Sequence, residues 1–190
     1  SSASVGCSTA CLNTAGRGSM HSVQDARVKK TRRFFENRIE FLSQLFKEIK
    51  SSVKSAAKKQ INSCFRLNLT SDLPWENMVV KHFPDSQFYD YTKHLKRFVA
   101  YLEGKLPDNY HLTYSRDETT PDTLVQSLCA SGGNVAVVFR GSLPKTWLGI
   151  EVIDGDDSDL RFKDGNGKIV GLLEKGLAKK DETGFVVEPC

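Results

Sequence analysis

Two cysteines near the start of the chain have a spacing that metal sites use. Cys7 and Cys11 form a C-x3-C pair in residues 1–19, which are rich in Ser, Gly, Ala and Thr and are expected to form an irregular loop. Thiolates that lie close together bind zinc or a [4Fe-4S] iron–sulfur cluster, although two are too few ligands for either. Cys190 follows the last apolar segment and is the third candidate. The candidate metal ligands are therefore Cys7, Cys11 and Cys190, and the alternative is a pair of loop thiols.

Charged and polar side chains interrupt or follow four short apolar segments further along the chain. Arg66 and Asn68 alternate with the apolar residues of one segment, and Asp90 lies inside the next. In parallel α/β folds ligands bind outside the carboxyl ends of the strands, where basic side chains bind anions and carboxylates transfer protons. For Ser71 and Asp72 the alternative role is helix capping. The candidate ligand-binding residues are Arg66, Asn68, Ser71, Tyr91, Lys93, Ser115 and Arg140, and the candidate catalytic residues are Asp72 and Asp90.

The segments that would carry these residues alternate between strands and helices. Strand-like sequences at 64–69, 87–91, 110–115 and 134–139 are separated by helical sequences, at intervals of about twenty residues. This alternation indicates right-handed β-α-β units and a mostly parallel sheet, and hence an α/β fold with a partial or closed (β/α) barrel. Further strands are expected at 149–153 and 184–187, with a β-hairpin turn at 164–167.

A long, basic helical segment precedes the first strand. Helical spacing places six apolar residues on one core-facing stripe: Phe35, Ile39, Leu42, Phe46, Ile49 and Val53. Residues 17–59 carry twelve Lys and Arg against four Asp and Glu, a net charge of +8, whereas the rest of the chain carries −4. This asymmetry indicates a nucleic-acid surface, and the alternative is a solvated basic helix face. The candidate nucleic-acid contacts are Arg17, Arg27, Lys29, Lys30, Arg32 and Arg33.

The composition limits the class of protein. With 190 residues, 39% hydrophobic and 26% charged, the chain is long enough to bury one core. We expect a single α/β domain over 1–190, with a cysteine loop (1–19), basic helices (20–60), β/α units (61–147) and C-terminal strands with a hairpin (148–190). No apolar run approaches the roughly 20 residues that cross a bilayer, so no membrane partner is expected. Five cysteines, an odd number, argue against a secreted disulfide framework and favour the cytoplasm.

Short motifs over almost the full length carry a further signal. They include Gly6-Cys7, Ala10-Cys11-Leu12-Asn13-Thr14-Ala15-Gly16-Arg17-Gly18, Val23-Gln24-Asp25-Ala26-Arg27, Arg66-Leu67-Asn68, Pro74-Trp75-Glu76, Phe88-Tyr89-Asp90-Tyr91-Thr92-Lys93, Asn109-Tyr110-His111-Leu112-Thr113, Val137-Val138-Phe139-Arg140-Gly141 and Asp159-Leu160-Arg161-Phe162. Together they resemble the bacteriophage family called gene product 88. The resemblance implies a phage protein in the cytoplasm of an infected bacterial host, and it carries no activity over to this chain.

The cysteine loop adds a more distant resemblance. Members of this phage family usually carry another cysteine seven positions before the one that matches Cys7, so we expect the natural N-terminus to lie upstream of Ser1. A C-x6-C-x3-C loop ahead of β/α units is similar to the radical S-adenosylmethionine enzymes, whose partial barrels hold a cluster at the strand ends. The resemblance implies an iron–sulfur cluster with S-adenosylmethionine as a further cofactor. Because this chain lacks the first cysteine, the cluster would need Cys190 as its third ligand.

Three functional classes stay open at this point. The first is a metal- or iron–sulfur-binding enzyme whose strand-end site takes an anionic small molecule. The second is a nucleic-acid-binding protein that uses residues 17–59. The third is an effector that binds a protein of the bacterial host, for which no residue gives specific support.

Overall fold

A mostly parallel eight-stranded sheet forms the centre of the computed structural model, which describes residues 3–11 and 15–189. The strands are β1 (Cys64–Phe65), β2 (Gln87–Thr92), β3 (Tyr110–Ser115), β4 (Asn134–Phe139), β5 (Thr146–Trp147), β6 (Ile150–Asp154), β7 (Ile169–Leu173) and β8 (Val186–Val187). Their order is β1-β2-β3-β4-β7-β6-β5, with β8 paired to the end of β4. In the described residues no pairing joins β1 to β5, so the sheet is open. The mixed α/β fold and the mostly parallel sheet are confirmed, and a closed barrel is wrong.

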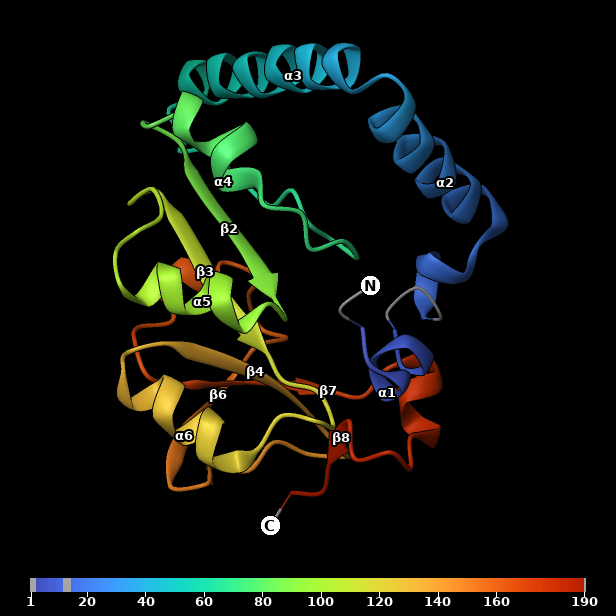
Figure 1. Ribbon diagram of the computed structural model, residues 1–190, viewed down its shortest axis with the longest axis vertical. Helices are drawn as coiled ribbons and strands as arrows, with labels where there is room; N and C mark the ends of the chain where they lie inside the picture. The colour runs from blue at the N-terminus through green and yellow to red at the C-terminus, as the bar shows by residue number, and fades with distance from the viewer. Residues whose placement is uncertain (1–2, 12–14, 190) are drawn as a thin grey trace.

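Different elements cover the two faces of the sheet. The crossover helices α5 (Leu95–Leu102) and α6 (Asp122–Ala130) lie on one face (Figure 1), where Phe98 packs 5.5 Å from Tyr114. The short helix η4 (Arg161–Lys163) lies on the other face, where Phe162 packs 5.6 Å from Tyr89. A central strand that is buried on both faces has a nearly continuous apolar sequence, and β4 (Asn134–Phe139) is an example.

The C-terminal part departs from the expected hairpin. The hairpin turn is formed by Leu148 and Gly149, with φ angles of 53° and 77°, and it joins the antiparallel strands β5 and β6. The prediction of a hairpin turn at 164–167 is wrong, because the strands before and after it, β6 and β7, are parallel. The segment between β6 and β7 instead crosses the sheet face through η4, and the tight turn only brings the chain into β7.

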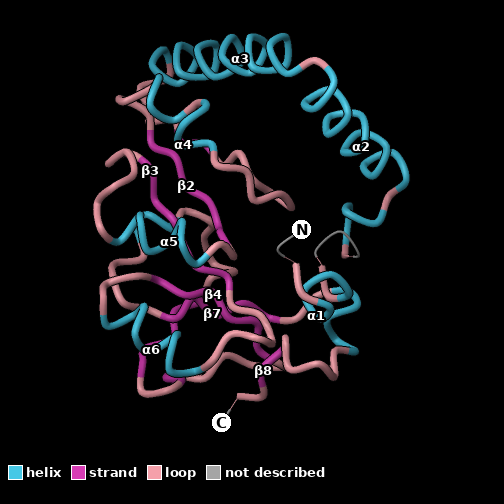
Figure 2. Tube along the Cα trace, viewed as in Figure 1, coloured by secondary structure: helices cyan, strands magenta, loops and turns pink. Residues whose placement is uncertain are grey.

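The N-terminal segment is helical from an early point. A single-turn helix, α1 (Val5–Thr9), and a 3-10 turn, η2 (Gly16–Ser19), lie where an irregular loop was expected over 1–19; residues 1–2 and 12–14 lie outside the described residues. Two longer helices follow, α2 (His21–Glu36) and α3 (Arg38–Lys58), and together they form an arch beside the sheet (Figure 2).

The apolar stripe of α3 packs on two short helices, α4 (Trp75–Met78) and η3 (Val80–His82), and Phe46 lies 5.2 Å from Phe83. The prediction that the stripe faces the core is wrong for two of its residues, since Phe35 is 72% exposed and Ile39 is 89% exposed. The helix breaks at Asn37 (φ −132°, ψ 55°), which changes the phase of the stripe. Phe34 is buried in their place, in edge contact with Phe41.

The remaining helical segment is η5 (Gly176–Lys180), which packs beside α1 through Ala178 and Ala10. Among the helices that the structure describes, none combines the length and the hydropathy that a bilayer crossing requires.

Candidate functional site

A cavity of about 1130 Å³ lies at the carboxyl ends of β1, β2, β3, β4, β6 and β7. Four of the strand residues that line it belong to neighbouring strands and share one face by register: Tyr91, Ser115, Val138 and Leu172. The cavity thus lies on the face of the sheet that also carries Tyr89 and η4, and α5 and α6 cover the opposite face. The cavity is therefore bounded below by the sheet and on its sides by loops and α1, as expected for a ligand site in a parallel sheet.

Eight residues of the predicted sites line this one cavity. They come from α1 and from the ends of β1, β2 and β3, and they are Cys7, Cys11, Arg66, Ser71, Asp72, Tyr91, Lys93 and Ser115. The structure thus brings the cysteine segment and the strand-end residues together at the same edge of the sheet. The separation of residues 7–11 and 66–115 along the chain does not by itself show that they lie close together in space.

The cations at the cavity are held in place by acidic and carbonyl oxygens. Arg66 donates two hydrogen bonds to the carboxylate of Asp159, at 2.8 and 3.1 Å, and its guanidinium lies 4.5 Å from the centre of the Tyr91 ring. Lys93 Nζ donates to the carbonyl oxygens of Ser115 and Arg116, both at 3.2 Å. These contacts hold both positive groups in place. Little of either side chain is exposed, 19% for Arg66 and 13% for Lys93.

Helix α1 is attached to the loop after β3 by Glu118. Ser4 Oγ donates to one carboxylate oxygen of Glu118 at 2.6 Å, and the backbone N–H of Gly6 donates to the other at 2.7 Å. Burial opposes the ionisation of Glu118, but these hydrogen bonds outweigh it and hold its pKa below the ordinary value. Glycine suits position 6 because a Cβ there would overlap Thr183 Oγ1 and would lie 2.8 Å from Glu118 Oε2. The attachment places Cys7 at the cavity wall.

Cys7 lies next to Lys93 and Cys11. Burial raises the pKa of the Cys7 thiol, while the Lys93 ammonium beside it lowers the pKa and the neighbouring sulfur of Cys11 raises it further. Burial is the largest of these effects, so Cys7 is a protonated thiol at neutral pH. This arrangement is less reactive than an exposed thiolate beside a cation.

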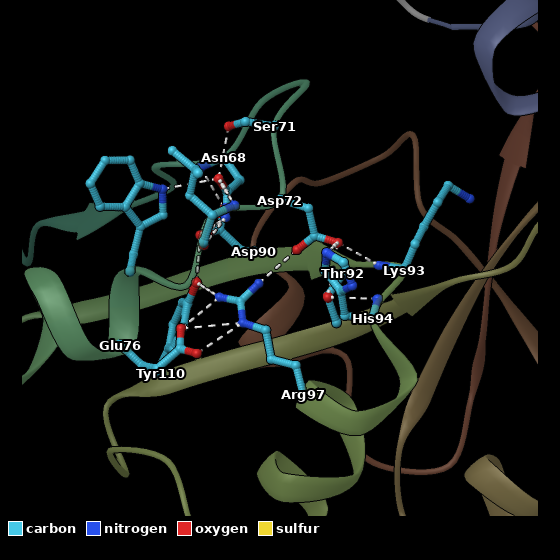
Figure 3. A network of polar contacts seen from close by, with 12 residues as sticks. Asn68, Ser71, Asp72, Glu76, Asp90, Thr92, Lys93, His94, Arg97 and Tyr110 are labelled. Carbon is cyan, nitrogen blue, oxygen red and sulfur yellow. Dashed lines mark hydrogen bonds and ion pairs between the residues drawn. The ribbon is translucent and has the colours of Figure 1, made fainter. Parts of the chain in front are cut away.

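A buried polar network lies under the cavity (Figure 3). Asp90 is 1% exposed and accepts hydrogen bonds from the backbone N–H of Asn68 (2.8 Å) and from the Tyr110 hydroxyl (2.7 Å). Burial raises the pKa of Asp90 to about 7, although these donors and the Arg97 guanidinium oppose the rise. The Asn68 side-chain oxygen in turn accepts from Ser71 Oγ, Leu73 N and Trp75 Nε1, at 2.8, 3.0 and 2.9 Å. Asn68 and Asp90 thus hold the loop that carries Ser71, and neither lines the cavity.

Arg97 links this network to the cavity edge. Its guanidinium contacts the buried carboxylate of Glu76 (2.8 Å), the Tyr110 hydroxyl (2.6 Å) and Asp72 (2.7 Å), as Figure 3 shows. The other oxygen of Asp72 accepts from the backbone N–H of Lys93 at 2.8 Å. Asp72 therefore positions the loop after β2. Sequence reasoning missed Arg97, Glu76 and Tyr110, because their partners lie on other elements and only the tertiary fold brings them together.

The other predicted residues lie elsewhere. Arg140 does not line the cavity; it pairs with Glu188 and donates to the carbonyl oxygens of Lys179 and Asp181. The six basic residues predicted to contact nucleic acid lie on η2 and α2, outside the cavity. Arg27 and Arg33 are half-buried, and the exposed members are Arg17, Lys29, Lys30 and Arg32.

The metal hypothesis gains no support from the described residues. Within 3–11 and 15–189 no group of three or more His, Cys, Asp or Glu side chains is placed to hold a metal ion. Cys190, the predicted third ligand, lies outside the described residues. Cys7 and Cys11 alone do not form a zinc or iron–sulfur site.

Comparison with known proteins agrees with the motifs in the sequence. Residues 1–189 match the family described as Gene product 88. The chain belongs to this family. A search of curated proteins and a search of solved structures gave no match. The Gene product 88 membership covers the cysteine segment, the strand ends and the buried network alike, whereas the resemblance to radical S-adenosylmethionine enzymes is not supported.

Proposed function

We propose that this member of the Gene product 88 family binds a small anionic organic molecule in the strand-end cavity. The convergence of eight predicted site residues on one cavity of about 1130 Å³ carries the proposal. In parallel α/β folds this edge of the sheet is where ligands bind, because the loops that follow the strands converge there.

The lining indicates the character of the ligand. The floor and walls are mainly apolar, with Tyr91, Leu172 and Phe185 as the large side chains. Three cations and three carboxylates also line the cavity: Arg66, Lys93 and Lys175, with Asp72, Asp156 and Asp159. Each carboxylate is already paired, Asp159 with Arg66, Asp156 with Lys175 and Asp72 with Arg97. Lys93 and Arg66 keep a small exposed surface that a ligand oxygen can contact. A molecule with an anionic end and a flat apolar body satisfies both parts of the lining.

Titration calorimetry with adenosine 5′-monophosphate tests this function, because the probe has a phosphate and an aromatic base. We expect binding in the micromolar to millimolar range, weakened at least tenfold by Lys93→Ala. Lys96→Ala is the matched control, since Lys96 is exposed on α5 and does not line the cavity. Inorganic phosphate, which has the anionic end alone, and adenosine 5′-diphosphate serve as further probes. If none of the three probes binds in the millimolar range, or if both variants behave alike, the proposal is wrong.

A second function, nucleic-acid binding, is favoured by one observation. Helix α2 carries five Lys and Arg against two acidic residues over 16 positions, and of these sixteen only Phe34 is buried. Such a surface attracts phosphates without regard to sequence. Fluorescence anisotropy with a labelled single-stranded oligonucleotide at increasing salt measures this attraction directly. An affinity that does not change with salt would exclude it.

A further inference from the structure

Several exposed cations of this chain lie beside the wall of the cavity. Helix α1, which carries Cys7 into the wall, is followed along the chain by η2 and α2 with their basic residues. On its other side α1 packs on η5, where Lys179 and Lys180 are exposed. Figure 1 shows α1 beside the red helical segment η5, while α2 lies further up the same side of the molecule and leads to α3. The cations of η5 therefore lie next to a residue of the cavity wall, Ala178, and those of η2 and α2 follow α1 along the chain.

The cavity itself offers a planar group for stacking. The Arg66 guanidinium lies 4.5 Å from the Tyr91 ring centre, and two hydrogen bonds to Asp159 fix its plane. Arg66 also lines the cavity. Guanidinium planes and aromatic rings are the surfaces on which unpaired nucleobases stack in single-strand-binding proteins.

We propose that the cavity receives a base of a single-stranded nucleic acid, while the phosphates of the same strand contact η2, α2 and η5. This inference rests on the proposed binding function of the cavity and names its ligand class. A single strand is favoured over a duplex because a base must leave the stack to enter a cavity, and in a duplex this also breaks its pairing. The base lies on the Arg66 guanidinium, and the basic helices fix the direction of the strand.

An anisotropy competition assay separates the contribution of the base from that of the phosphates. A labelled single strand of about 15 nucleotides is displaced either by the same unlabelled strand or by an abasic strand of equal length. Because one stacked base contributes about 1–3 kcal/mol, the strand with bases should compete at least roughly fivefold better. Arg66→Lys keeps the charge but removes the plane, so it should make the two competitors equal while the affinity for the abasic strand stays unchanged.

The basic surface is tested with a second set of variants. A triple substitution of exposed α2 cations combines Lys29→Ala, Lys30→Ala and Arg32→Ala. It should weaken both competitors alike and reduce the salt slope by about 2, the value expected for three lost phosphate contacts on a single strand. The matched control is the triple substitution Lys47→Ala, Lys50→Ala and Lys54→Ala on α3, which should leave the slope unchanged.

The outcomes distinguish this inference from the function on which it rests. Equal competition by the abasic strand in the unmodified protein, or no strand binding at low salt, overturns the inference. If adenosine 5′-monophosphate still binds and Lys93→Ala still weakens it, the proposed function stands without the inference. Tyr91→Leu, which removes the ring beneath the guanidinium, gives a second test should Arg66→Lys fail to fold. It should reduce the advantage of the strand with bases, because the guanidinium plane loses the ring that supports it, and an unchanged advantage would count against the inference.

Discussion

Asp90, which is buried, and His111, which is half-buried, are two groups whose titrations act on the stability of the fold in opposite directions. Burial raises the pKa of Asp90 from 3.8 to about 7. Burial, with a smaller contribution from the Arg161 guanidinium, lowers the pKa of His111 from 6.5 to about 4. The two residues lie on adjacent strands, β2 and β3, and both are outside the cavity lining.

The sign of each effect follows from comparing the folded with the unfolded chain. For Asp90 the folded state holds the proton more tightly, so stability is greatest at low pH and falls as the pH rises from about 4 to 7. That difference in pKa corresponds to at most about 4 kcal/mol. For His111 the unfolded state holds the proton more tightly, so stability rises from about pH 4 to 6.5, by at most about 3 kcal/mol. In the unmodified protein the two contributions nearly cancel.

Single substitutions should therefore expose opposite slopes. Asp90→Asn leaves His111 in place, and the free energy of unfolding should rise between pH 4 and 7, by up to about 3 kcal/mol. His111→Asn leaves Asp90 in place, and the free energy of unfolding should fall over the same range, by up to about 4 kcal/mol. Urea denaturation followed by tryptophan fluorescence at several pH values measures both. Asp85→Asn, at an exposed loop position, is the control and should follow the unmodified protein.

An unchanged pH profile in Asp90→Asn would refute this reasoning. It would mean that the three hydrogen bonds to Asp90 from Asn68 and Tyr110 keep the carboxylate ionised throughout the range. Burial would then not be the dominant effect on the pKa of Asp90.

Three further substitutions test the contacts that build the site. Asn68→Ala removes the acceptor of Ser71 Oγ, Leu73 N and the buried Trp75 Nε1 and should cost about 1–3 kcal/mol in urea denaturation, whereas Ser71→Ala removes one contact of an exposed residue and should cost less than about 1 kcal/mol; equal losses would contradict the network. Arg97→Ala leaves the carboxylates of Glu76 and Asp72 without their cation and should cost about 3–5 kcal/mol, and a loss under about 1 kcal/mol would show that the ion pairs contribute little. Gly6→Ala should displace α1 and speed alkylation of the Cys7 thiol, and an unchanged alkylation rate would contradict the attachment of α1 through Glu118.

Local sequence patterns predicted the central strands because each is a short apolar run between turn residues. The predicted bounds 110–115 and 134–139 are those of β3 and β4. The first strand is shorter than predicted. The backbone N–H of Asn68, at the end of that segment, binds the Asp90 carboxylate rather than a neighbouring strand. The shorter strand therefore results from a contact between distant segments, which a local sequence pattern cannot show.

The position of the site could be predicted from the strand-end rule, but the direction of its side chains could not. Tyr91 and Asp90 are neighbours in sequence and point to opposite faces of β2. The cavity lies on the face of Tyr91, while Asp90 faces Tyr110 and the helices. Which face carries the cavity depends on α1 and on the loop after β6, and both reach it from distant parts of the chain.

The most direct test of the central claim is the location of ligand-induced chemical shift changes in a nuclear magnetic resonance titration. With adenosine 5′-monophosphate as the probe, we predict that the largest backbone amide shifts occur at residues that line the cavity, such as Thr70, Ser115, Leu172 and Phe185. Amides on the exposed side of α3 should not shift. Shifts confined to α2 and α3, or no shifts at millimolar probe, would contradict a ligand site at the strand ends.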